Sequence, residues 1–436
     1  MQLETVEMKK TKNDVFPEDW EIDEIGNLFD IQQGKALSKK NRLGNRPRPF
    51  LRTANVYWGR LESNHLDRMD FTEEEEEKYR LEVNDLLICE GGDIGRTAIV
   101  DRELKGIYHQ NHVFRARALN GSVNSKFVMY WMQAAIKLLN LYSGFGNKTT
   151  IANLSKSRLS AYKIPLPHLP EQRKIASILS TVQEAIEQTE SVIQATRELK
   201  KSMMKHLFTY GPVPVSQADQ VGLKKTEIGN VPSEWDIVKV NKVFDFSRKP
   251  RNLKLQSKQE IPFIPMGSIS ESWDQVERYV PKKWEEISSG TFVEKNDLIV
   301  AKITPSFENG KQALLKNLPI DFGYATTEVW ALHPNKNNKV LSEFLFYYLK
   351  KKNIRAEIAN KMEGSTGRQR VPKSVLANLL IPLPSISIQQ KVINYFWALD
   401  YKIKQEQDRI NGLNRLFNSL LENLMTAKIR VVKKGV

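Results

Sequence analysis

The sequence predicts a mixed α/β fold in which two duplicated globular domains are separated by two long helices that pair as an antiparallel coiled coil. Three observations lead to this prediction. The chain has 436 residues, which is more than one hydrophobic core usually supports. Short motifs occur twice in the same order, and a long run of heptad-spaced apolar residues follows each copy.

The internal repeat is the strongest organising signal in the chain. Its two copies are offset by roughly 215 residues, far longer than the period of a solenoid, so we expect a duplicated domain and not a stacked array. The matching segments are residues 17–22 and 232–237, 29–30 and 244–245, 84–88 and 296–300, and 164–167 and 381–384.

A heptad segment follows the repeated Ile-Pro-Leu-Pro in each copy. Proline does not interrupt either segment, and charged residues fill the outward positions, as in coiled-coil helices. About 38 residues in each helix predict a rod of roughly 57 Å. The expected seam comprises Ile175, Leu179, Val182, Ile186, Ile193, Met203 and Leu207 in the first segment and Val392, Phe396, Leu399, Ile403, Ile410, Leu413, Phe417, Leu420 and Leu424 in the second.

Antiparallel pairing would place the globular halves at opposite ends of the rod, related by an approximate two-fold axis. Thr189 and Glu406 stand at equivalent seam positions, where polar groups set the register at some cost in stability. The alternative is two independent amphipathic helices, each lying on its own domain. A helix of that kind rarely needs more than ~25 residues, which favours the coiled coil.

These landmarks divide the chain into a globular domain at residues 1–168, a central helix at 169–210, a second globular domain at 211–384 and a C-terminal helix at 385–436. Short strands and helices are expected to alternate within the globular domains. The expected strands are residues 85–89, 97–100, 297–301 and 328–332, and the expected helices are residues 127–141 and 341–362.

Composition restricts the partners and the compartment. There are 66 Lys and Arg against 51 Asp and Glu, a net charge of +15, as expected for a partner rich in phosphate. Acidic membranes or acidic proteins would fit the same charge. The single Cys89 excludes a disulfide framework, and neither a membrane helix of ~20 residues nor a signal peptide is recognisable. We therefore expect a cytoplasmic protein that binds nucleic acid.

Several catalytic motifs are missing from the sequence. Gly-x-Gly-x-x-Gly, the Asn/Asp-Pro-Pro-aromatic motif of adenine methyltransferases, the phosphate-binding Gly-x-x-x-x-Gly-Lys-Ser/Thr and Gly-x-Ser-x-Gly do not occur, so we expect no bound methyl donor, no ATP and no serine hydrolase site. A nuclease is the sharpest alternative, because Asp297 precedes Lys302. Val300 stands where the second metal-binding carboxylate should be, and Asp85 and Glu90 in the first copy lack the lysine.

Two further clusters have ordinary interpretations. His109 and His112 have a spacing that suits a metal on a helix, but residues 108–114 indicate a strand or loop and no Cys or carboxylate completes a site. We expect them to form hydrogen bonds or to contact DNA, and we predict no metal site. Residues 73–77, a run of Glu, are expected to form a solvated helical face pointing away from phosphates.

Several loops combine glycine, short polar side chains and Arg or Lys, the mixture that can approach base edges and hold phosphates. The first pair of loops is residues 90–96 and 302–306, and the second pair is residues 146–150 and 364–370. Because the members of each pair differ in sequence, the two halves should read different bases. The candidate DNA-binding residues are Gly92, Arg96, Asn111, His112, Asn147, Lys148, Thr149, Lys302, Thr304, Ser365, Arg368, Gln369 and Arg370.

At this point the chain resembles a known family, the specificity subunits of type I restriction-modification systems. The likeness runs from residues 151–155 through Ile-Pro-Leu-Pro to residues 169–175, and it recurs from Pro382 onward. The segments around Trp20 and Trp235 and the Asn-Asp-Leu strands also fit, so the likeness covers most of the chain. The second copy departs where Ser-Ile-Gln-Gln replaces Pro-Glu-Gln-Arg and loses the Glu.

The resemblance implies two target recognition domains, each reading one half of a bipartite DNA sequence, held apart by the long helices. It implies that two modification subunits dock on this scaffold and methylate adenine with S-adenosylmethionine, and that restriction subunits join for cleavage. S-adenosylmethionine, ATP and Mg²⁺ would then belong to the partners. Two alternatives stay open: a self-sufficient Mg²⁺-dependent DNA endonuclease, and a coiled-coil adaptor for acidic proteins.

Overall fold

The computed structural model describes residues 8–10, 15–38, 42, 44–139, 141, 154–251, 253, 258–271, 274–276, 278–336, 339–365 and 367–431. Its contacts divide the chain into two compact units. The first unit is Met1–Glu190 with Arg409–Val436, and the second unit is Ser191–Asp408. Among the described residues, no helix combines the length and the apolar character needed to cross a membrane.

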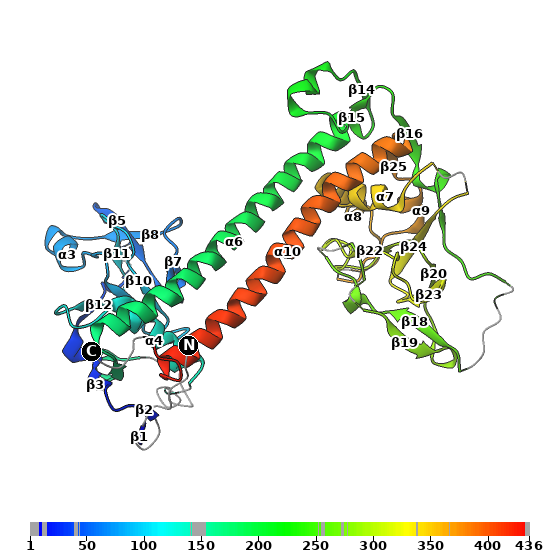
Figure 1. Ribbon diagram of the computed structural model, residues 1–436. Helices are drawn as coiled ribbons and strands as arrows, with labels where there is room; N and C mark the ends of the chain where they lie inside the picture. Colours follow the sequence, from blue (N-terminus) through cyan, green and yellow to red (C-terminus); the bar gives the residue numbers. More distant parts are fainter. Residues whose placement is uncertain are drawn as a thin grey trace. The chain divides into compact units, whose positions relative to one another are not determined.

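The first unit is built on a four-stranded antiparallel sheet in the order β10-β9-β12-β4, of which Figure 1 labels β10 and β12. These strands are β4 (Phe29–Gln33), β9 (Leu86–Cys89), β10 (Thr97–Ile99) and β12 (Val113–Ala118). A second sheet contains β5 (Pro47–Leu51), β8 (Asp67–Asp70) and β11 (Tyr108–His109), and two-stranded pairs join β1 (Met8–Lys10) to β2 (Val15–Pro17), β3 (Glu21–Glu24) to β13 (Lys163–Leu166) and β6 (Val56–Tyr57) to β7 (Arg60–Leu61). The helices are α1 (Ile25–Leu28), α3 (Glu73–Lys78), α4 (Ser125–Lys137) and α5 (Lys156–Ser160), with the 3₁₀ turn η1 (Thr53–Asn55).

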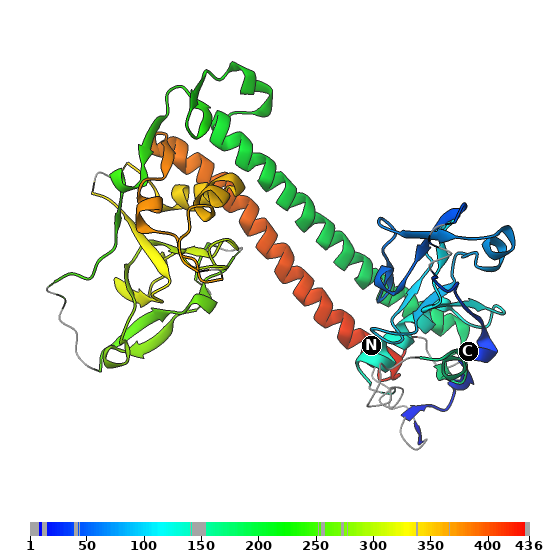
Figure 2. The same ribbon diagram turned by 180° about the vertical axis from the view of Figure 1, so that it is seen from behind.

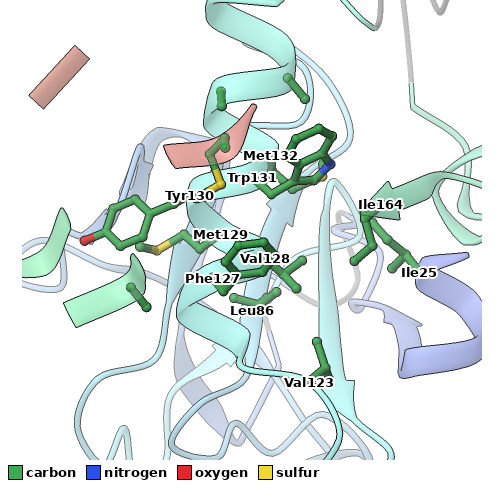
Figure 3. Close-up of a cluster of buried hydrophobic side chains, with 14 of the residues drawn as sticks. Ile25, Leu86, Val123, Phe127, Val128, Met129, Tyr130, Trp131, Met132 and Ile164 are labelled. Atoms are coloured by element: carbon green, nitrogen blue, oxygen red, sulfur yellow. The ribbon is translucent and has the colours of Figure 1, made fainter. Parts of the chain in front are cut away.

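Helix α4 supplies much of the core of the first unit. The Asn124 side chain caps it by accepting a hydrogen bond from the Phe127 N–H, which satisfies one of the free donors of the first turn. Buried side chains cover most of the helix because the sheet lies on one side and the long helices on another. Figure 3 shows Phe127, Met129 and Tyr130 projecting from α4, with Leu86 and Ile164 in the same cluster.

The second unit repeats this plan. Its first sheet has the order β17-β24-β21-β22, and its second sheet has the order β19-β18-β23-β20. The strands are β17 (Phe244–Phe246), β18 (Glu260–Ile264), β19 (Val280–Lys283), β20 (Thr291–Glu294), β21 (Leu298–Ala301), β22 (Gln312–Leu314), β23 (Phe322–Ala325) and β24 (Val329–Pro334), with the pairs β14 (Leu223–Thr226) to β15 (Gly229–Pro232) and β16 (Asp236–Lys239) to β25 (Leu380–Leu383). The helices are α7 (Ser342–Leu349), α8 (Lys352–Ala359) and α9 (Lys373–Ala377), with the 3₁₀ turns η2 (Val215–Gln220), η3 (Val240–Lys242), η4 (Met266–Ser268) and η5 (Trp284–Glu286).

The repeated sequence motifs occupy the same structural positions in both units. Ile-Pro-Leu forms the strand that pairs with the segment after the repeated Trp, so Pro165 lies opposite Ile22 and Pro382 lies opposite Ile237. Proline is tolerated here because the pair has only two strands and leaves an edge free. The duplication and the mixed α/β class predicted from the sequence are therefore confirmed.

The long helices α6 (Leu169–Tyr210) and α10 (Ile386–Met425) each contribute to both units (Figures 1 and 2). In the first unit, Ile175 and Leu179 near the start of α6 share a core with Phe417 near the end of α10. In the second unit, Phe208 near the end of α6 stacks on Phe396 near the start of α10, with ring centroids 5.9 Å apart. Opposite ends meet in both units, so the helices run antiparallel as predicted.

None of the predicted seam residues is exposed. Ile175, Leu179, Ile186, Ile193, Leu207, Val392, Phe396, Ile410, Phe417 and Leu424 are buried, and Val182, Met203, Leu399, Ile403, Leu413 and Leu420 are half-buried. The polar seam residues are buried as well. The hydroxyl of Thr189 donates to the Ala185 carbonyl at 2.6 Å, and Lys402 Nζ lies 2.5 Å from Glu406 Oε1.

The start of each long helix is held by a buried glutamine. The Gln172 side chain accepts from the Asn124 N–H at 2.8 Å and donates to the Pro167 carbonyl at 2.8 Å. Gln389 makes the equivalent bonds with Leu341 and Pro384 at 2.9 Å. The change from Pro-Glu-Gln-Arg to Ser-Ile-Gln-Gln therefore keeps the residue that joins the helix start to the sheet domain.

The prediction of a single helix over residues 341–362 is wrong. The chain forms α7 and α8, separated at Lys350 and Lys351. Helix α7 is buried on nearly all sides, and the two lysines interrupt its apolar run. The Lys350 and Lys351 N–H groups donate to the Tyr347 and Tyr348 carbonyls at 3.1 Å and tighten the last turn of α7, and Lys350 Nζ donates to the Glu271 carbonyl at 2.6 Å. The predicted helix over residues 127–141 is α4, which begins two residues earlier and ends at Lys137.

Candidate nucleic-acid interface

In the first unit, three segments meet beyond the end of β9. The Glu90 N–H donates to the His112 carbonyl at 3.0 Å, and the Leu154 N–H donates to the Glu90 carbonyl at 2.8 Å. His112 Nδ1 lies 2.9 Å from Glu90 Oε2. The predicted loop at residues 90–96 therefore lies beside the turn that carries Asn111 and beside the segment leading to α5. Gly92 and His112 are exposed, and Asn111 is half-buried.

The Arg96 side chain is held against η1, outside its own loop. Its guanidinium donates to the Thr53 carbonyl at 2.5 Å and lies 5.6 Å from the centre of the Tyr57 ring. Arg60 approaches the same ring at 5.4 Å. In this conformation Arg96, a candidate DNA-binding residue, holds the loop to η1, while the exposed Tyr57 presents an aromatic face between two arginines. Sequence reasoning missed Tyr57, because nothing in its local pattern marks it as exposed.

Gly92 and Gly95 meet different structural requirements in this loop. Gly92 and Gly95 both have positive φ, at 76° and 72°, a conformation that L side chains rarely adopt. A Cβ on Gly95 would also lie 2.4 Å from a methyl carbon of Ile136, whereas a Cβ on Gly92 would meet open space. Gly95 therefore allows the loop to pack on α4, and Gly92 leaves a gap at the exposed tip.

In the second unit, the two predicted loops lie side by side. The Lys302 N–H donates to the Glu328 carbonyl at 2.9 Å, the Val371 N–H donates to the Lys302 carbonyl at 2.7 Å, and the Thr304 N–H donates to the Gln369 carbonyl at 3.0 Å. These bonds repeat the junction at Glu90, His112 and Leu154 in the first unit. The sequence singled out both loops, and the tertiary structure brings them together.

The charged side chains at this junction are partly neutralised. The Arg370 guanidinium donates to both carboxylate oxygens of Glu328, at 2.9 and 2.7 Å, which lowers the pKa of the Glu328 carboxyl. Lys302 Nζ lies 4.3 Å from the centre of the Trp330 ring, and burial lowers the pKa of Lys302. Ser365 and Arg368 are exposed, Gln369 is half-buried, and the Thr304 hydroxyl donates to Glu308 at 3.1 Å.

A buried arginine, Arg355, holds the 302–310 loop in place. Arg355 donates to the carbonyls of Phe307 and Leu349 at 2.8 and 3.1 Å and also binds the Gln312 side chain. Burial lowers its pKa to about 10. Arg355 thereby ties the end of the 302–310 loop to α7, a role that its sequence context does not reveal. The candidates Asn147, Lys148 and Thr149 lie outside the described residues.

The buried Asp297 has structural partners. Its carboxylate accepts hydrogen bonds from the Ser247 hydroxyl at 2.6 Å, the Glu294 N–H at 2.9 Å and His333 Nδ1 at 2.7 Å. Asp297 precedes β21 and Lys302 follows it, so about 16 Å of extended strand separates them. The nuclease alternative needs both residues at one phosphodiester.

Glu294, Asp297 and His333 place their ligand atoms within 4.8 Å of one another, a grouping that could hold a metal ion. Sequence reasoning, which predicted no metal site, missed this group because His333 lies far along the chain. In the first unit the equivalent strand carries Arg117, whose guanidinium bonds both oxygens of Asp85 at 2.8 Å. A cationic side chain thus fills the corresponding position there.

The two histidines flagged in the first half have separate roles. His109 is fully buried, and its Nδ1–H donates to the Val113 carbonyl at 3.0 Å. Burial lowers the pKa of His109 to about 4.

Helix α3 carries the Glu run and is mostly exposed, and its carboxylates pair with Lys35, Arg46 and Arg48.

The geometry defines a duplicated protein with two comparable loop surfaces, one on each α/β unit. The family model described as "Type I restriction modification DNA specificity domain" matches residues 17–195 and 232–415. The chain belongs to this family, and the resemblance stated from the sequence is confirmed.

Individual relatives agree with the family match. The chain is 25% identical over 439 residues to the putative type I restriction enzyme MjaX specificity subunit of Methanocaldococcus jannaschii, covering 97% of this chain and 96% of the relative. It is 30% identical over 197 residues to the EcoAI specificity subunit of Escherichia coli, covering 45% of this chain and 33% of the relative. The crystal structure of the S subunit from M. genitalium has the same fold, with a TM-score of 0.56, 18% identity and coverage of 95% and 97%.

Proposed function

We propose that this chain is the non-catalytic DNA-recognition subunit of a cytoplasmic type I restriction-modification complex. Each α/β unit reads one half of a bipartite target, and the paired helices set the gap between the two half-sites. The observation that carries this proposal is the repeated junction beyond β9 and β21. The same backbone bonds hold glycine-bearing or basic loops in both units, while the side chains differ.

The chemistry is assigned to partner subunits. Two modification subunits docking along α6 and α10 would methylate adenine with S-adenosylmethionine, and restriction subunits would use ATP and Mg²⁺. Support comes from the absence of the corresponding cofactor motifs in the sequence. The net charge of +15 favours duplex DNA as the direct ligand of this chain.

The test is a domain exchange in the assembled complex. We expect replacement of residues 17–168 by the corresponding domain of another specificity subunit to change one half of the methylated sequence and to leave the other half unchanged. The measurement is a genome-wide methylation map made with each version of the complex. An unchanged target would overturn the proposal.

The endonuclease alternative has its own test. The purified chain with Mg²⁺ alone should leave duplex DNA intact. Cleavage that disappears in Asp297→Ala would establish the alternative and would reassign Glu294, Asp297 and His333 as a metal site.

A further inference from the structure

At one structurally equivalent pair of positions, the two units carry an acidic and a basic residue in opposite order. In the first unit the pair is Glu90 and His112, and in the second unit it is Lys302 and Glu328. The equivalence rests on one backbone bond, from the N–H of the first residue to the carbonyl of the second, at 3.0 Å and 2.9 Å. The acidic group therefore lies at the end of β9 in one unit and at the start of β24 in the other.

Glu328 has a further partner that fixes the neighbouring loop. Its carboxylate holds Arg370 in a two-bond fork, a geometry that constrains direction as well as distance. Arg370 also exchanges two backbone bonds with Glu363, at 2.8 and 2.9 Å, and forms a bridge to Ile303. The Glu328–Arg370 fork thus stands at the closed end of the loop 364–369.

The fork also decides which positive charges face outward. Arg370 is neutralised by Glu328, and Lys302 lies against the Trp330 ring. Arg368 is exposed in the same loop and has no side-chain hydrogen bond or ion pair among the described residues. The loop therefore presents Arg368 and Gln369, a guanidinium and an amide of the kinds that read guanine and adenine.

We propose that Glu328 is a positioning residue for recognition of the half-site read by the second unit. It holds Arg370 as a support, so that Arg368 and Gln369 reach the bases in one orientation and Arg370 makes no phosphate contact. This inference rests on the proposed function, because it requires the loop to face DNA. Among the described residues of the first unit, His112 bonds Glu90 and takes part in no such fork, so this half-site serves as an internal control.

The test variant is Glu328→Gln, which keeps the shape of the side chain and removes its charge. The full chain, assembled with its modification subunits, is used to select from a duplex library in which both half-sites are randomised. We expect base discrimination in the half-site read by the second unit to fall about tenfold, the effect of losing one well-placed base contact. Discrimination in the other half-site should stay unchanged.

A second readout separates positioning from a purely structural role. Binding of the duplex selected by the wild type is measured over a series of KCl concentrations. The freed Arg370 can then reach a phosphate, so the slope of log K against log salt should steepen by about one contact in Glu328→Gln. Arg370→Gln should broaden the same half-site without changing the slope, and the double variant should match Arg370→Gln.

Glu343→Gln is the matched control, because it breaks the ion pair with Lys316 in the same unit away from the loops. It should change neither half-site nor the salt slope. The inference is overturned if Glu328→Gln leaves the half-site and the slope as in the wild type, or if Arg370→Gln alone makes the slope shallower by one contact. If the wild-type complex selects no bipartite sequence, the proposed function itself fails.

Discussion

The two units use different basic residues to bind an equivalent buried carboxylate. Arg117 in β12 bonds Asp85, and His333 in β24 bonds Asp297. The hydrogen bond that His333 donates to Asp297 raises the pKa of His333 above its usual value. Glu294 and Asp245 also face His333 and act in the same direction. The cation is thus permanent in the first unit and titratable in the second.

We predict that the second unit loses stability as the pH rises above about 6.5. The folded-state pKa of His333 is raised, so its stabilising contribution is fully present below the unfolded value of about 6.5 and is lost as the pH rises through the folded pKa. His333→Arg should remove this loss. The measurement is hydrogen exchange of β17 and β24 in the full chain across this pH range, and an equal loss in the variant would contradict the prediction.

His109 provides a comparison of opposite sign in the first unit. Burial lowers its pKa to about 4, so the neutral form is favoured on folding. The unfolded chain binds the proton more tightly, and stability therefore falls as the pH drops from about 6.5 towards the folded pKa. Acid should weaken β11 and β12 by this route, whereas the contribution of His333 is already fully present below about pH 6.5.

The long helices α6 and α10 connect the two units. Their ends belong to the cores of the two units, through Ile175 with Phe417 and through Phe208 with Phe396. Gln172 and Gln389 join each helix start to the adjoining sheet domain. A change of helix length therefore alters elements that belong to both units.

We predict that removing one heptad from each helix, residues 189–195 together with 406–412, shortens the preferred gap between half-sites by about 3 base pairs. A heptad spans about 10 Å, and a base pair rises about 3.4 Å. Affinity should also fall, because the two half-sites rotate relative to each other around the DNA. The gap is measured by selection from duplexes with variable spacers.

The control for this experiment removes the heptad from α6 alone. The two helices then differ in length by one heptad, so their ends cannot all keep their contacts in the two cores, and the folded protein should be destabilised instead of acquiring a shorter gap. An unchanged gap in the paired deletion would show that the helices do not set the spacing.

At the scale of the whole molecule, Arg430 connects segments that are far apart along the chain. Arg430 bonds both oxygens of Asp19, at 3.1 and 2.7 Å, and both oxygens of Glu171, at 2.7 Å. These hydrogen bonds raise the pKa of Arg430 above its usual value. Glu171 is buried, with 3% of its side chain exposed. The Glu that the second copy lacks therefore has a partner at the C-terminal end of the chain.

Arg430→Ala should destabilise the first unit by about 3 kcal/mol, because it leaves the buried Glu171 carboxylate without its cation. Arg430→Lys should retain part of the stability, since it keeps the charge and loses the fork. Denaturant unfolding of the full chain provides the measurement. Lys428→Ala, which removes an exposed pair with Glu422, should cost less than about 1 kcal/mol, and a loss equal to that of Arg430→Ala would contradict this explanation.

The sequence by itself determined the duplication, the two long helices, their apolar seam and the family. These properties follow from spacing along the chain, and a heptad pattern or a repeated motif keeps its meaning wherever the domain packs. The sequence also identified the loops around Gly92, Lys302 and Arg368. It placed α7 and α8 in one helix, because periodicity alone did not show that Lys350 would leave the apolar run.

Only the tertiary structure decided which of these loops meet and which charges remain available. Lys302 and Gln369 become neighbours through strand pairing, Glu328 neutralises Arg370, and Arg430 reaches Glu171 across most of the chain length. Such contacts join residues that are distant in sequence. Their partners are selected by the packing of the sheets and helices, which no local pattern encodes.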